Sequence, residues 1–357
     1  MTKLSEINVL LTGVGAPGAP GIIKSLRLVN ERNISIIGVD SDIKNSIGRG
    51  LVDKFSQISN ADDPNFIEDL LDISKKNKVD VIVPLVTKEL FKLSLNSSTF
   101  SENGIKVIVS DYDKLKLVNN KYELMNFAKQ ISIPVPDFRL VDSIEDFISK
   151  CYELGYPEKT ICFKPPISNG MRGFRILNDS EDKMNSLINE KPNNVFIGFN
   201  EFINIARQSS YFPELLLMEY LPGQEYSVDA LANGKQSICV IPRTREKIKM
   251  GISFVGETIF HKEIINYSEK IIEHLGLFGN IGFQFKEDEF GKPKIIESNP
   301  RVQGTIILCT ASGYNMVYNA IKIALNEKPI QYKIDWNVKM IRYWDEIFIK
   351  NSNSFRL

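Results

Sequence analysis

Four short, almost continuously apolar segments stand out in the first third of the chain. They are NVLLT (8–12), ISIIGV (34–39), VDVIVPL (79–85) and IKVIVS (105–110). Strands that are buried on both faces of a parallel sheet have this pattern. Between them lie segments of helical periodicity, such as 64–77, in which a proline occupies a first-turn position. Residues 1–112 are therefore predicted to form a doubly wound α/β domain.

The alternation of strands and helices stops after residue 112. One helix is predicted over 113–130, and Pro134 and Pro136 follow it. Further on, Asn-Gly at 233–234 lies between two apolar runs and is the strongest hairpin signal in the chain. Mixed antiparallel strands with flanking helices predict an α+β region up to about residue 330. The remaining tail is too short for a domain, and we expect it to pack back on the core.

The first apolar strand leads into a G-x-G-x-x-G motif, GVGAPG at 13–18. In a strand–loop–helix unit this motif can bind a dinucleotide, and Asp40 would then hold the ribose. An NAD(P)-dependent reductase or epimerase is therefore one alternative function. Two Y-x-x-x-K strings, at 112–116 and 318–322, would be its further support. The glycine motif alone is a weak signal.

Composition narrows the class of protein. The 357-residue chain has 44 Lys plus Arg and 44 Asp plus Glu, so no overall field attracts nucleic acid or an anionic membrane. Four dispersed cysteines and two histidines leave little material for disulfides or a zinc site. The uncharged run 302–321 has transmembrane length, but its polar side chains favour a water-soluble fold. With no signal-peptide pattern, we expect a cytoplasmic protein with neither nucleic-acid nor membrane partners.

Oxygen-bearing side chains concentrate in IGFQFKEDEFGKPKIIESNPR (281–301), which is predicted to be two strands and a turn. Glu297 and Asn299 share one face of their strand, whereas Ile296 points the other way. If the phenylalanines beside Gln284 point into the core, its amide faces the same cleft. Three such oxygen ligands suit Mg²⁺, which also keeps phosphate ligands. A polar outer face of a surface hairpin is the alternative.

Two further segments have the composition of a nucleotide site. In FKPPISNGMRGFRIL, Lys164 ends a strand, and the glycine-containing loop 168–173 can cover a polyphosphate with its N–H groups. In LLLMEYLPGQEYSVDA, the backbone of Glu219 and Leu221 can present a C=O and an N–H to an adenine edge. Glu225 could accept hydrogen bonds from ribose hydroxyls. Taken alone, each segment could equally be an ordinary hairpin.

In this order, these segments resemble the ATP-grasp superfamily, and within it the synthetase domains of the carbamoyl phosphate synthetase large subunit. The resemblance covers nearly all of the chain and includes NKYELMNFAKQISIPVPDF, MEYLPGQEYSVD, ESNPRVQGT and ASGYNMVYNAIKIAL. It implies a Rossmann-like pre-ATP-grasp domain over 1–112 and a two-lobed ATP-grasp domain over 113–330. The mobile lid lobe would cover about 135–217, and 331–357 would be a C-terminal extension.

The resemblance also implies roles for individual residues. The nucleotide would be bound by Lys121, Lys164, Ser168, Asn169, Gly170, Gly173, Glu219, Leu221 and Glu225. The Mg²⁺ ligands, with Mn²⁺ as a substitute ion, would be Gln284, Glu297 and Asn299. Arg301 would neutralise the transferring phosphate, and Lys164 would assist in catalysis.

Substrate recognition is expected at two places. Arg243, Arg245 and Lys247 alternate along an extended segment and so would face the same way, which suits a carboxylate or phosphate. An exposed basic strand is the alternative. In the resembled family the glycine loop borders the acceptor side of the cleft, which makes Gly15 a further candidate.

The activity implied is that of an ATP- and Mg²⁺-dependent ligase forming a C–N bond. A small-molecule carboxylate would become an acyl phosphate, an amine would attack it, and ADP and phosphate would be released. A homodimer is compatible with the sequence. Met218 replaces a glutamate common at the adenine edge, and VQGT follows Arg301 in place of a serine-rich continuation. A single ATP-grasp unit weighs against carbamoyl phosphate synthesis, and a non-catalytic ATP-binding sensor is a further alternative.

Overall fold

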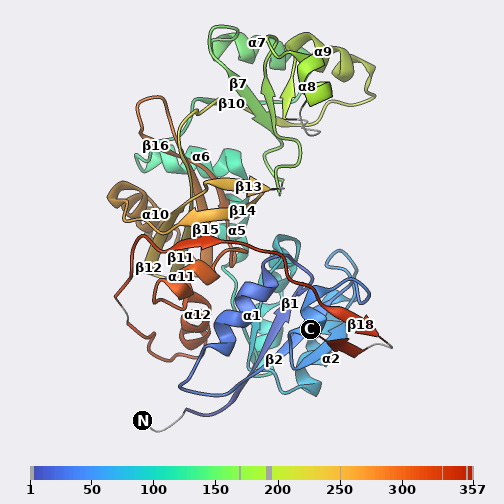
Figure 1. The fold of residues 1–357 in the computed structure, drawn as a ribbon, viewed down its shortest axis with the longest axis vertical. Helices are drawn as coiled ribbons and strands as arrows, with labels where there is room; N and C mark the ends of the chain where they lie inside the picture. Colours follow the sequence, from blue (N-terminus) through green and yellow to red (C-terminus); the bar gives the residue numbers. More distant parts are fainter. Residues whose placement is uncertain are drawn as a thin grey trace.

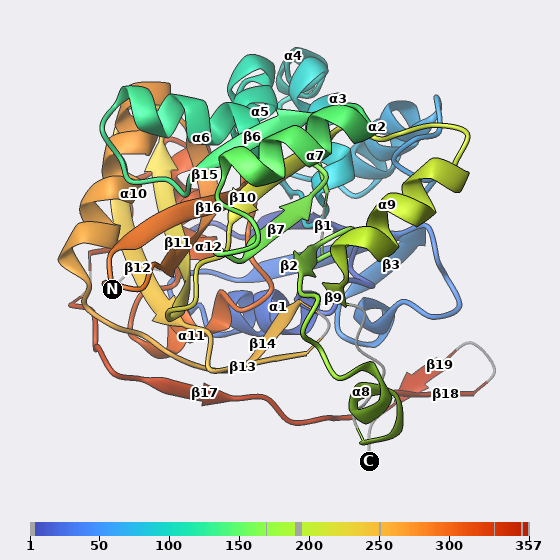
Figure 2. The same cartoon turned by 90° about the horizontal axis from the view of Figure 1, so that it is seen from above.

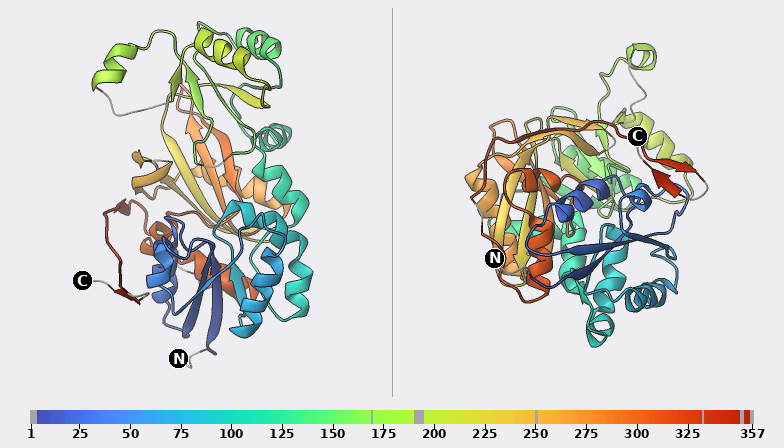
Figure 3. Two further views of the ribbon diagram at one scale, coloured as in Figure 1. Left: turned by 90° about the vertical axis from the view of Figure 1, so that its right-hand side faces the viewer. Right: turned by 60° about the horizontal axis from the view of Figure 1, so that its bottom comes forward.

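The computed structural model describes residues 4–168, 170–189, 195–249, 251–331, 333–350 and 353–355. Three bodies follow one another along the long axis of the molecule: an N-terminal α/β domain, a central antiparallel sheet with its helices, and a small lobe (Figure 1). Figure 3 shows the same stacking from the side, with the small lobe at one end. The predicted combination of α/β and α+β architecture is confirmed.

The N-terminal domain is built on a parallel sheet with strand order β3-β2-β1-β4-β5. Its strands are β1 (Ile7–Thr12), β2 (Ile34–Asp40), β3 (Lys54–Gln57), β4 (Val81–Val83) and β5 (Lys106–Val107). Its helical segments are α1 (Ala19–Arg27), η1 (Ile47–Gly50), α2 (Phe66–Lys76), η2 (Thr87–Glu89), α3 (Leu90–Leu95) and α4 (Ser97–Glu102). The four predicted apolar runs coincide with β1, β2, β4 and β5. Strand β3 has the sequence KFSQ and lacks an apolar run, so the pattern did not predict it.

The small lobe carries a second sheet, with strand order β6-β10-β7-β8-β9. Its strands are β6 (Phe138–Val141), β7 (Ile161–Lys164), β8 (Arg175–Leu177), β9 (Phe196–Ile197) and β10 (Leu215–Glu219). Its helices are α7 (Ile144–Glu153), α8 (Lys183–Asn189) and α9 (Phe199–Gln208). Aromatic packing forms its core, because the ring of Phe147 lies 5.4 Å from that of Phe163 and 4.5 Å from that of Phe202.

The central sheet has the strand order β12-β11-β15-β16 and is antiparallel throughout. Its strands are β11 (Glu225–Asn233), β12 (Ser237–Thr244), β15 (Phe278–Glu287) and β16 (Pro293–Asn299). Helix α10 (Lys262–Leu275) packs on β12, and α12 (Met316–Ala324) packs on β11 and β15. The hairpin predicted at Asn-Gly 233–234 joins β11 to β12, and Gly234 has φ +88.

The single helix predicted over 113–130 is instead two helices, α5 (Tyr112–Asn119) and α6 (Lys121–Gln130). Asn120 between them has an extended conformation, with φ −93 and ψ 116. Its side chain accepts hydrogen bonds from the backbone N–H groups of Tyr122 and Glu123. Asparagine is a preferred N-cap. The break puts Lys121 at the first position of the new helix, beside the small lobe.

The uncharged run 302–321 packs inside the protein as α11 (Ile307–Ala311) and α12. In the part of the chain that the structure describes, no helix combines the length and apolar character needed to cross a membrane. Val302 and Tyr318 instead share a hydrophobic core with Ile22 of α1. The N-terminal domain and the segment after β16 are therefore joined by continuous packing.

A close backbone approach lies at this junction. A Cβ atom placed on Gly18 would lie 2.3 Å from the Cα of Gly304, far inside van der Waals contact. Only glycine allows two backbones to come this close. The third glycine of the G-x-G-x-x-G motif is thus required by packing between segments that are far apart in the sequence.

The C-terminal segment packs back on the body, as expected. Strand β17 (Lys339–Ile341) pairs with β14 (Ile252–Glu257), which in turn pairs with β13 (Lys247–Lys249). Figure 2 shows β17 running along this sheet towards the hairpin of β18 (Phe348–Lys350) and β19 (Asn353–Phe355). The end of the chain then lies against the N-terminal domain, where Gly50 approaches Ile347 and Ser354. We call residues 333–350 the strap.

We predict that Gly18→Ala destabilises the protein by about 1–3 kcal/mol, the usual range for overpacking, because the backbone of Gly304 cannot move aside. Gly21→Ala is the matched control in the same helix, since its Cβ would meet only the side chain of Ile307, at 3.2 Å. Thermal or urea unfolding of the two variants measures the difference. Equal stabilities would contradict the proposed role of the Gly18–Gly304 contact.

Candidate active site

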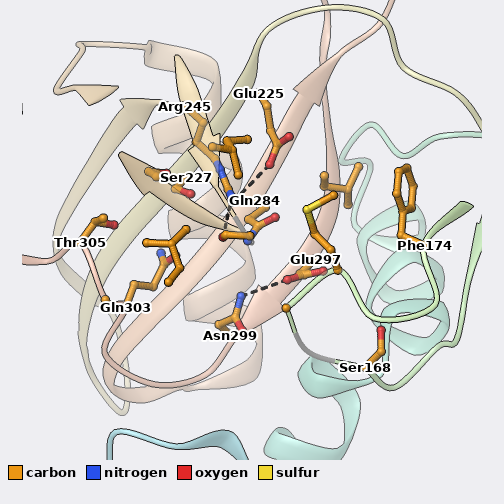
Figure 4. Close-up of a pocket in the computed structure, with 18 of the residues that line it drawn as sticks. Ser168, Phe174, Glu225, Ser227, Arg245, Gln284, Glu297, Asn299, Gln303 and Thr305 are labelled. Carbon is orange, nitrogen blue, oxygen red and sulfur yellow. Dashed lines mark hydrogen bonds and ion pairs between the residues drawn. The ribbon is translucent and has the colours of Figure 1, made fainter. Parts of the chain in front are cut away.

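A cavity of about 780 Å³ lies between the three bodies, within the size range of ligand sites. Its walls come from the loop after β1 (residues 16–18), the small lobe, the central sheet and the segment after β16. Figure 4 shows Glu225, Gln284, Glu297 and Asn299 projecting into it from the strands of the central sheet.

One cross-strand row of side chains forms the floor of this cavity. Arg243 on β12 is opposite Ser227 on β11, Ser227 is opposite Gln284 on β15, and Gln284 is opposite Glu297 on β16. All four line the cavity. Directly opposed residues lie on the same face of a sheet, so the shared face predicted for Gln284 and Glu297 is present.

The prediction that Ile296 points away from the cleft was wrong, because a bulge interrupts β16. The register passes from Gln284↔Glu297 to Phe285↔Ile295, which leaves Ile296 unpaired. A bulge breaks the alternation of faces, and Ile296 lines the cavity together with Glu297. Its carbonyl group, free of the ladder, accepts a hydrogen bond of 3.2 Å from the Nζ of Lys164.

Two buried lysines from different elements converge on one carboxylate. Lys121 on α6 is 3 % exposed and Lys164 on β7 is 7 % exposed. Their Nζ atoms lie 3.9 and 3.8 Å from Oε2 of Glu297. Lys121 also donates to the carbonyl of Ser168 at 3.0 Å. Burial lowers the pKa of Lys121 to about 8, and Lys164 adds to this while Glu297 opposes it. The pair forms a positively charged pocket suited to phosphate groups.

The donor set around Glu297 is one of hard oxygen ligands. Asn299 donates its amide N–H to Oε1 of Glu297 at 3.3 Å, which leaves the amide oxygen of Asn299 available. Gln284 adds a second amide oxygen. Among the described residues no three His, Cys, Asp or Glu side chains gather as a metal site. These residues fit Mg²⁺ if phosphate oxygens of a nucleotide complete its coordination, as is usual for that ion.

Arg301 is anchored at the boundary with the N-terminal domain. Its Nε donates to Oγ1 of Thr87 at 3.0 Å, and its side chain lines the cavity. No motif in the sequence indicated a role for Thr87. Behind it lies Glu89, which accepts a hydrogen bond from Thr12. Burial raises the pKa of Glu89 to about 7, with Asp40 adding to the rise and Arg301 opposing it.

The backbone at Glu219 and Leu221 has one acceptor and one donor without a strong partner among the described residues. The N–H of Glu219 donates to Asp137, but its carbonyl receives only the weak S–H contact of Cys162, at 3.8 Å. Leu221 donates its N–H to no other described residue. These are the two groups that would contact adenine if the prediction for Glu219 and Leu221 is correct. Lys286, which sequence reasoning missed, lies over the ring of Tyr220 at 4.6 Å and lines the same wall.

The loop predicted to cover the phosphates begins at Ser168, whose carbonyl accepts a hydrogen bond from Lys121. Gly170 and Gly173 belong to this loop, and both have positive φ angles, +65 and +76. A Cβ on Gly173 would meet Pro165 at 2.5 Å, so this glycine is required by both conformation and space. Asn169, the remaining loop candidate, lies outside the described residues.

The substrate candidates are only partly brought together. Gly15 does not line the main cavity, contrary to expectation; its N–H donates to Asp40 at 2.6 Å, and it lines a separate cavity of about 330 Å³. Its neighbours 16–18 reach the main cavity instead. Lys247 is exposed on β13 and does not continue the face of Arg243, because the chain turns after β12.

Arg243 and Arg245 do line the cavity, but each is ion-paired. Nε of Arg243 donates to buried Asp229 at 2.8 Å, and Arg245 lies 3.2 Å from Glu225. Figure 4 shows the second pair at the upper edge of the cavity. Glu225, predicted to bind ribose hydroxyls, is therefore already held by a cation, and its second oxygen is left for a ligand.

We predict that Glu89 makes stability fall as the pH rises. Its pKa is about 7 in the folded protein against an ordinary value of 4.5, so its favourable contribution is complete below about pH 4.5 and is lost as the pH rises through 7. The difference in the free energy of unfolding between Glu89→Gln and the wild type should therefore shift by about 2–3 kcal/mol in favour of the variant from pH 5 to pH 8. Glu68→Gln, on the exposed face of α2, is the control. A pH-independent difference for Glu89→Gln would contradict the assignment.

Two family models match separate parts of the chain. Residues 9–108 match the PylC-like N-terminal domain, and residues 211–343 match the model described as ATP-grasp in the biosynthetic pathway with Ter operon. These matches cover the N-terminal sheet and the central sheet with its metal-ligand candidates.

Curated relatives include carbamoyl phosphate synthase large chains. That of Clostridium perfringens is 26% identical over 274 residues, covering 73% of this chain and 23% of the relative. That of Methanobrevibacter smithii is 28% identical over 287 residues, covering 74% of this chain and 25% of the relative. This chain thus spans about a quarter of the length of these relatives.

Solved structures share the fold. A Campylobacter jejuni biotin carboxylase complex gives a TM-score of 0.67 at 17% identity, covering 93% of this chain and 74% of that one. A Staphylococcus aureus N5-carboxyaminoimidazole synthetase complexed with ADP gives a TM-score of 0.67 at 16% identity, covering 94% and 82%. The chain is therefore similar to an ATP-grasp family model over residues 211–343 and to the PylC-like N-terminal domain over residues 9–108, and it shares its fold with these solved structures.

Proposed function

We propose that this protein is an ATP- and Mg²⁺-dependent ligase that joins a carboxylic acid to an amine through an acyl phosphate. The observation that carries the proposal is the convergence of buried Lys121 and Lys164 on Glu297. Lys164 and Glu297 line the cavity together with Gln284 and Asn299, and Lys121 lies directly behind them. Two cations held out of water beside a set of hard oxygen ligands suit a metal-bound polyphosphate.

The nucleotide would lie between the small lobe and the central sheet. The open carbonyl of Glu219 and N–H of Leu221 would pair with the adenine edge, and Glu225 would accept from the ribose. The phosphates would then extend along the wall to Lys164 and Lys121, under the loop that begins at Ser168.

Catalysis would consist mainly of positioning and charge neutralisation. Gln284, Glu297 and Asn299 would hold Mg²⁺, which when bound would supply positive charge to the reacting phosphates. Lys121 and Lys164 would neutralise the phosphate oxygens, and Arg301 would face the γ-phosphoryl group during its transfer. The hydrogen bond from Arg301 to Thr87 helps to fix that guanidinium, which forms no ion pair with any carboxylate of the described residues.

The chemistry balances in two steps. A carboxylate oxygen forms a bond to the γ-phosphorus as the bond to the β-phosphate oxygen breaks, which gives an acyl phosphate and ADP. The amine then forms a bond to the carbonyl carbon, phosphate leaves, and the amine loses a proton. The cavity holds both reactants out of water, which protects the acyl phosphate from hydrolysis.

The residues that would support a reductase are engaged elsewhere. Asp40 accepts hydrogen bonds from the backbone N–H groups of Gly15 and Asp42, so it closes the glycine loop instead of facing a ribose. Tyr318 and Lys322 of one Y-x-x-x-K string both bind Glu31 at 2.5 Å. They form a structural ion pair between α12 and the N-terminal domain.

We predict that Glu297→Gln lowers kcat by at least about 100-fold while the fold persists, because it removes the only carboxylate of the metal set without changing volume. Glu289→Gln, in the exposed turn of the same hairpin, is the control and should leave kcat unchanged. Release of ADP in the presence of candidate acids and amines is the assay. Activity of Glu297→Gln within about tenfold of the wild type, or ~1.4 kcal/mol, would show that the metal assignment is wrong.

We predict that the nucleotide product is ADP and that an acyl phosphate can be trapped. Lys121, Lys164 and Arg301 place cations around the terminal phosphates, which favours transfer of the γ-phosphoryl group. With the acid present and the amine omitted, hydroxylamine should give a hydroxamate in step with ADP. Formation of AMP and pyrophosphate would refute the acyl phosphate route, even for a protein of this fold.

A further inference from the structure

The cavity continues well beyond the metal-ligand candidates. Glu297 and Arg243 occupy the two outer strands of the central sheet, β16 and β12, with β15 and β11 between them. Three strand spacings amount to about 14 Å. Both residues line the same cavity. The backbones of Arg243 and Glu297 are thus well separated on the cavity floor, so we expect Arg243 to contact a different part of the ligand from Glu297.

Arg243 keeps open donors at that far end. The side chain is 2 % exposed, and its Nε donates to Asp229, which is 1 % exposed. No other described residue accepts a hydrogen bond from its two terminal nitrogens, and the side chain lines the cavity. The hydroxyl-bearing residues Ser227 and Ser253 line the same end. Buried arginine donors without an acceptor are unfavourable unless a ligand supplies one.

The strap adds a further cation next to this end. The backbone N–H of Arg342 donates to the carbonyl of Phe254, which continues the pairing of β17 with β14. Its guanidinium donates to the carbonyl of Gly304, a residue of the cavity wall. The Nε of Arg342 is buried without a hydrogen-bond partner. No carboxylate of the described residues forms an ion pair with it, and burial together with Arg243 lowers its pKa.

The charges at this end do not balance. Arg243 is offset by Asp229 and Arg245 by Glu225, and Arg342 has no counterpart among the described carboxylates. An uncompensated cation in a partly buried site is destabilising. An anionic group bound beside Arg243 would satisfy the open donors and cancel the excess charge at once.

We infer that the acid substrate carries a second anionic group, a carboxylate or a phosphate, that binds at the Arg243 end of the cavity. This inference rests on the proposed ligase function, in which the first carboxylate reacts beside Glu297. Arg243 and Arg245 contact the second group, and Arg342 acts as a positioning residue through Gly304 and through its charge. The strap thereby becomes part of the substrate site.

The test compares diacids with acids that have one charge. Succinate, adipate and suberate, and the monoamide of each, are titrated calorimetrically into wild-type protein saturated with Mg·ADP. The longest diacid should bind at least about tenfold more tightly than its monoamide, the size of one charge-assisted contact, and the shortest should show no such preference. Phosphonate-terminated analogues of the same lengths then distinguish carboxylate from phosphate as the second group.

Arg342→Gln is the informative variant, because removing Arg243 would leave Asp229 as a buried unpaired charge. It should reduce the diacid preference to less than about threefold while Mg·ADP binding stays unchanged. Lys339→Gln is the matched control, since it removes one positive charge from the same strand but on its exposed side, where Lys339 pairs with Glu246. That variant should keep the full preference.

Three results would overturn the inference: equal binding of diacids and monoamides, no binding of any diacid to protein that binds Mg·ADP, or equal losses in Arg342→Gln and Lys339→Gln. Mg·ADP binding is measured first, without any diacid, so the ligase proposal is tested independently of the second anion site. Protein that binds no Mg·ADP would refute the ligase proposal. In that case a diacid preference that depends on Arg342 would still establish the anion site.

Discussion

The site depends on one carboxylate that holds two buried lysines. Glu297 comes from the central sheet, Lys121 from the helix that follows the N-terminal domain, and Lys164 from the small lobe. No two of these elements are neighbours in sequence, so their convergence fixes how the lobes meet. A charged lysine buried to this extent would be unfavourable without a negative partner. Because both lysines share the single carboxylate of Glu297, one positive charge remains in excess. That excess supports the proposal that the groove binds a polyphosphate.

The N-terminal domain contributes a wall to this groove through the residues that follow Gly15. Its glycine loop is closed from behind by Asp40 and meets the segment after β16 at Gly18 and Gly304. A motif associated with pyrophosphate binding is therefore used for close packing between backbones. Arg301 crosses the same boundary to Thr87, so the cation expected at the transferring phosphate is positioned by the N-terminal domain.

Two local irregularities adapt the regular elements to the site. The bulge at Ile296 frees a carbonyl that binds Lys164, and the N-cap at Asn120 restarts a helix so that Lys121 lies at its beginning. Each departs from the local pattern at the point where a cation must be placed, and such departures are common at functional sites.

The sequence by itself determined the apolar strands, the Asn-Gly hairpin and the shared face of Gln284 and Glu297, because these depend on local periodicity and turn chemistry. The break at Asn120 was also present in the sequence, as an N-cap within an otherwise helical run. The bulge at Ile296 was not, because register depends on the partner strand. Only the tertiary structure decided two further features: Gly15 does not line the main cavity, and Arg342 lies beside Gly304. Both depend on contacts between residues that are far apart along the chain, where periodicity carries no information about which surfaces will meet.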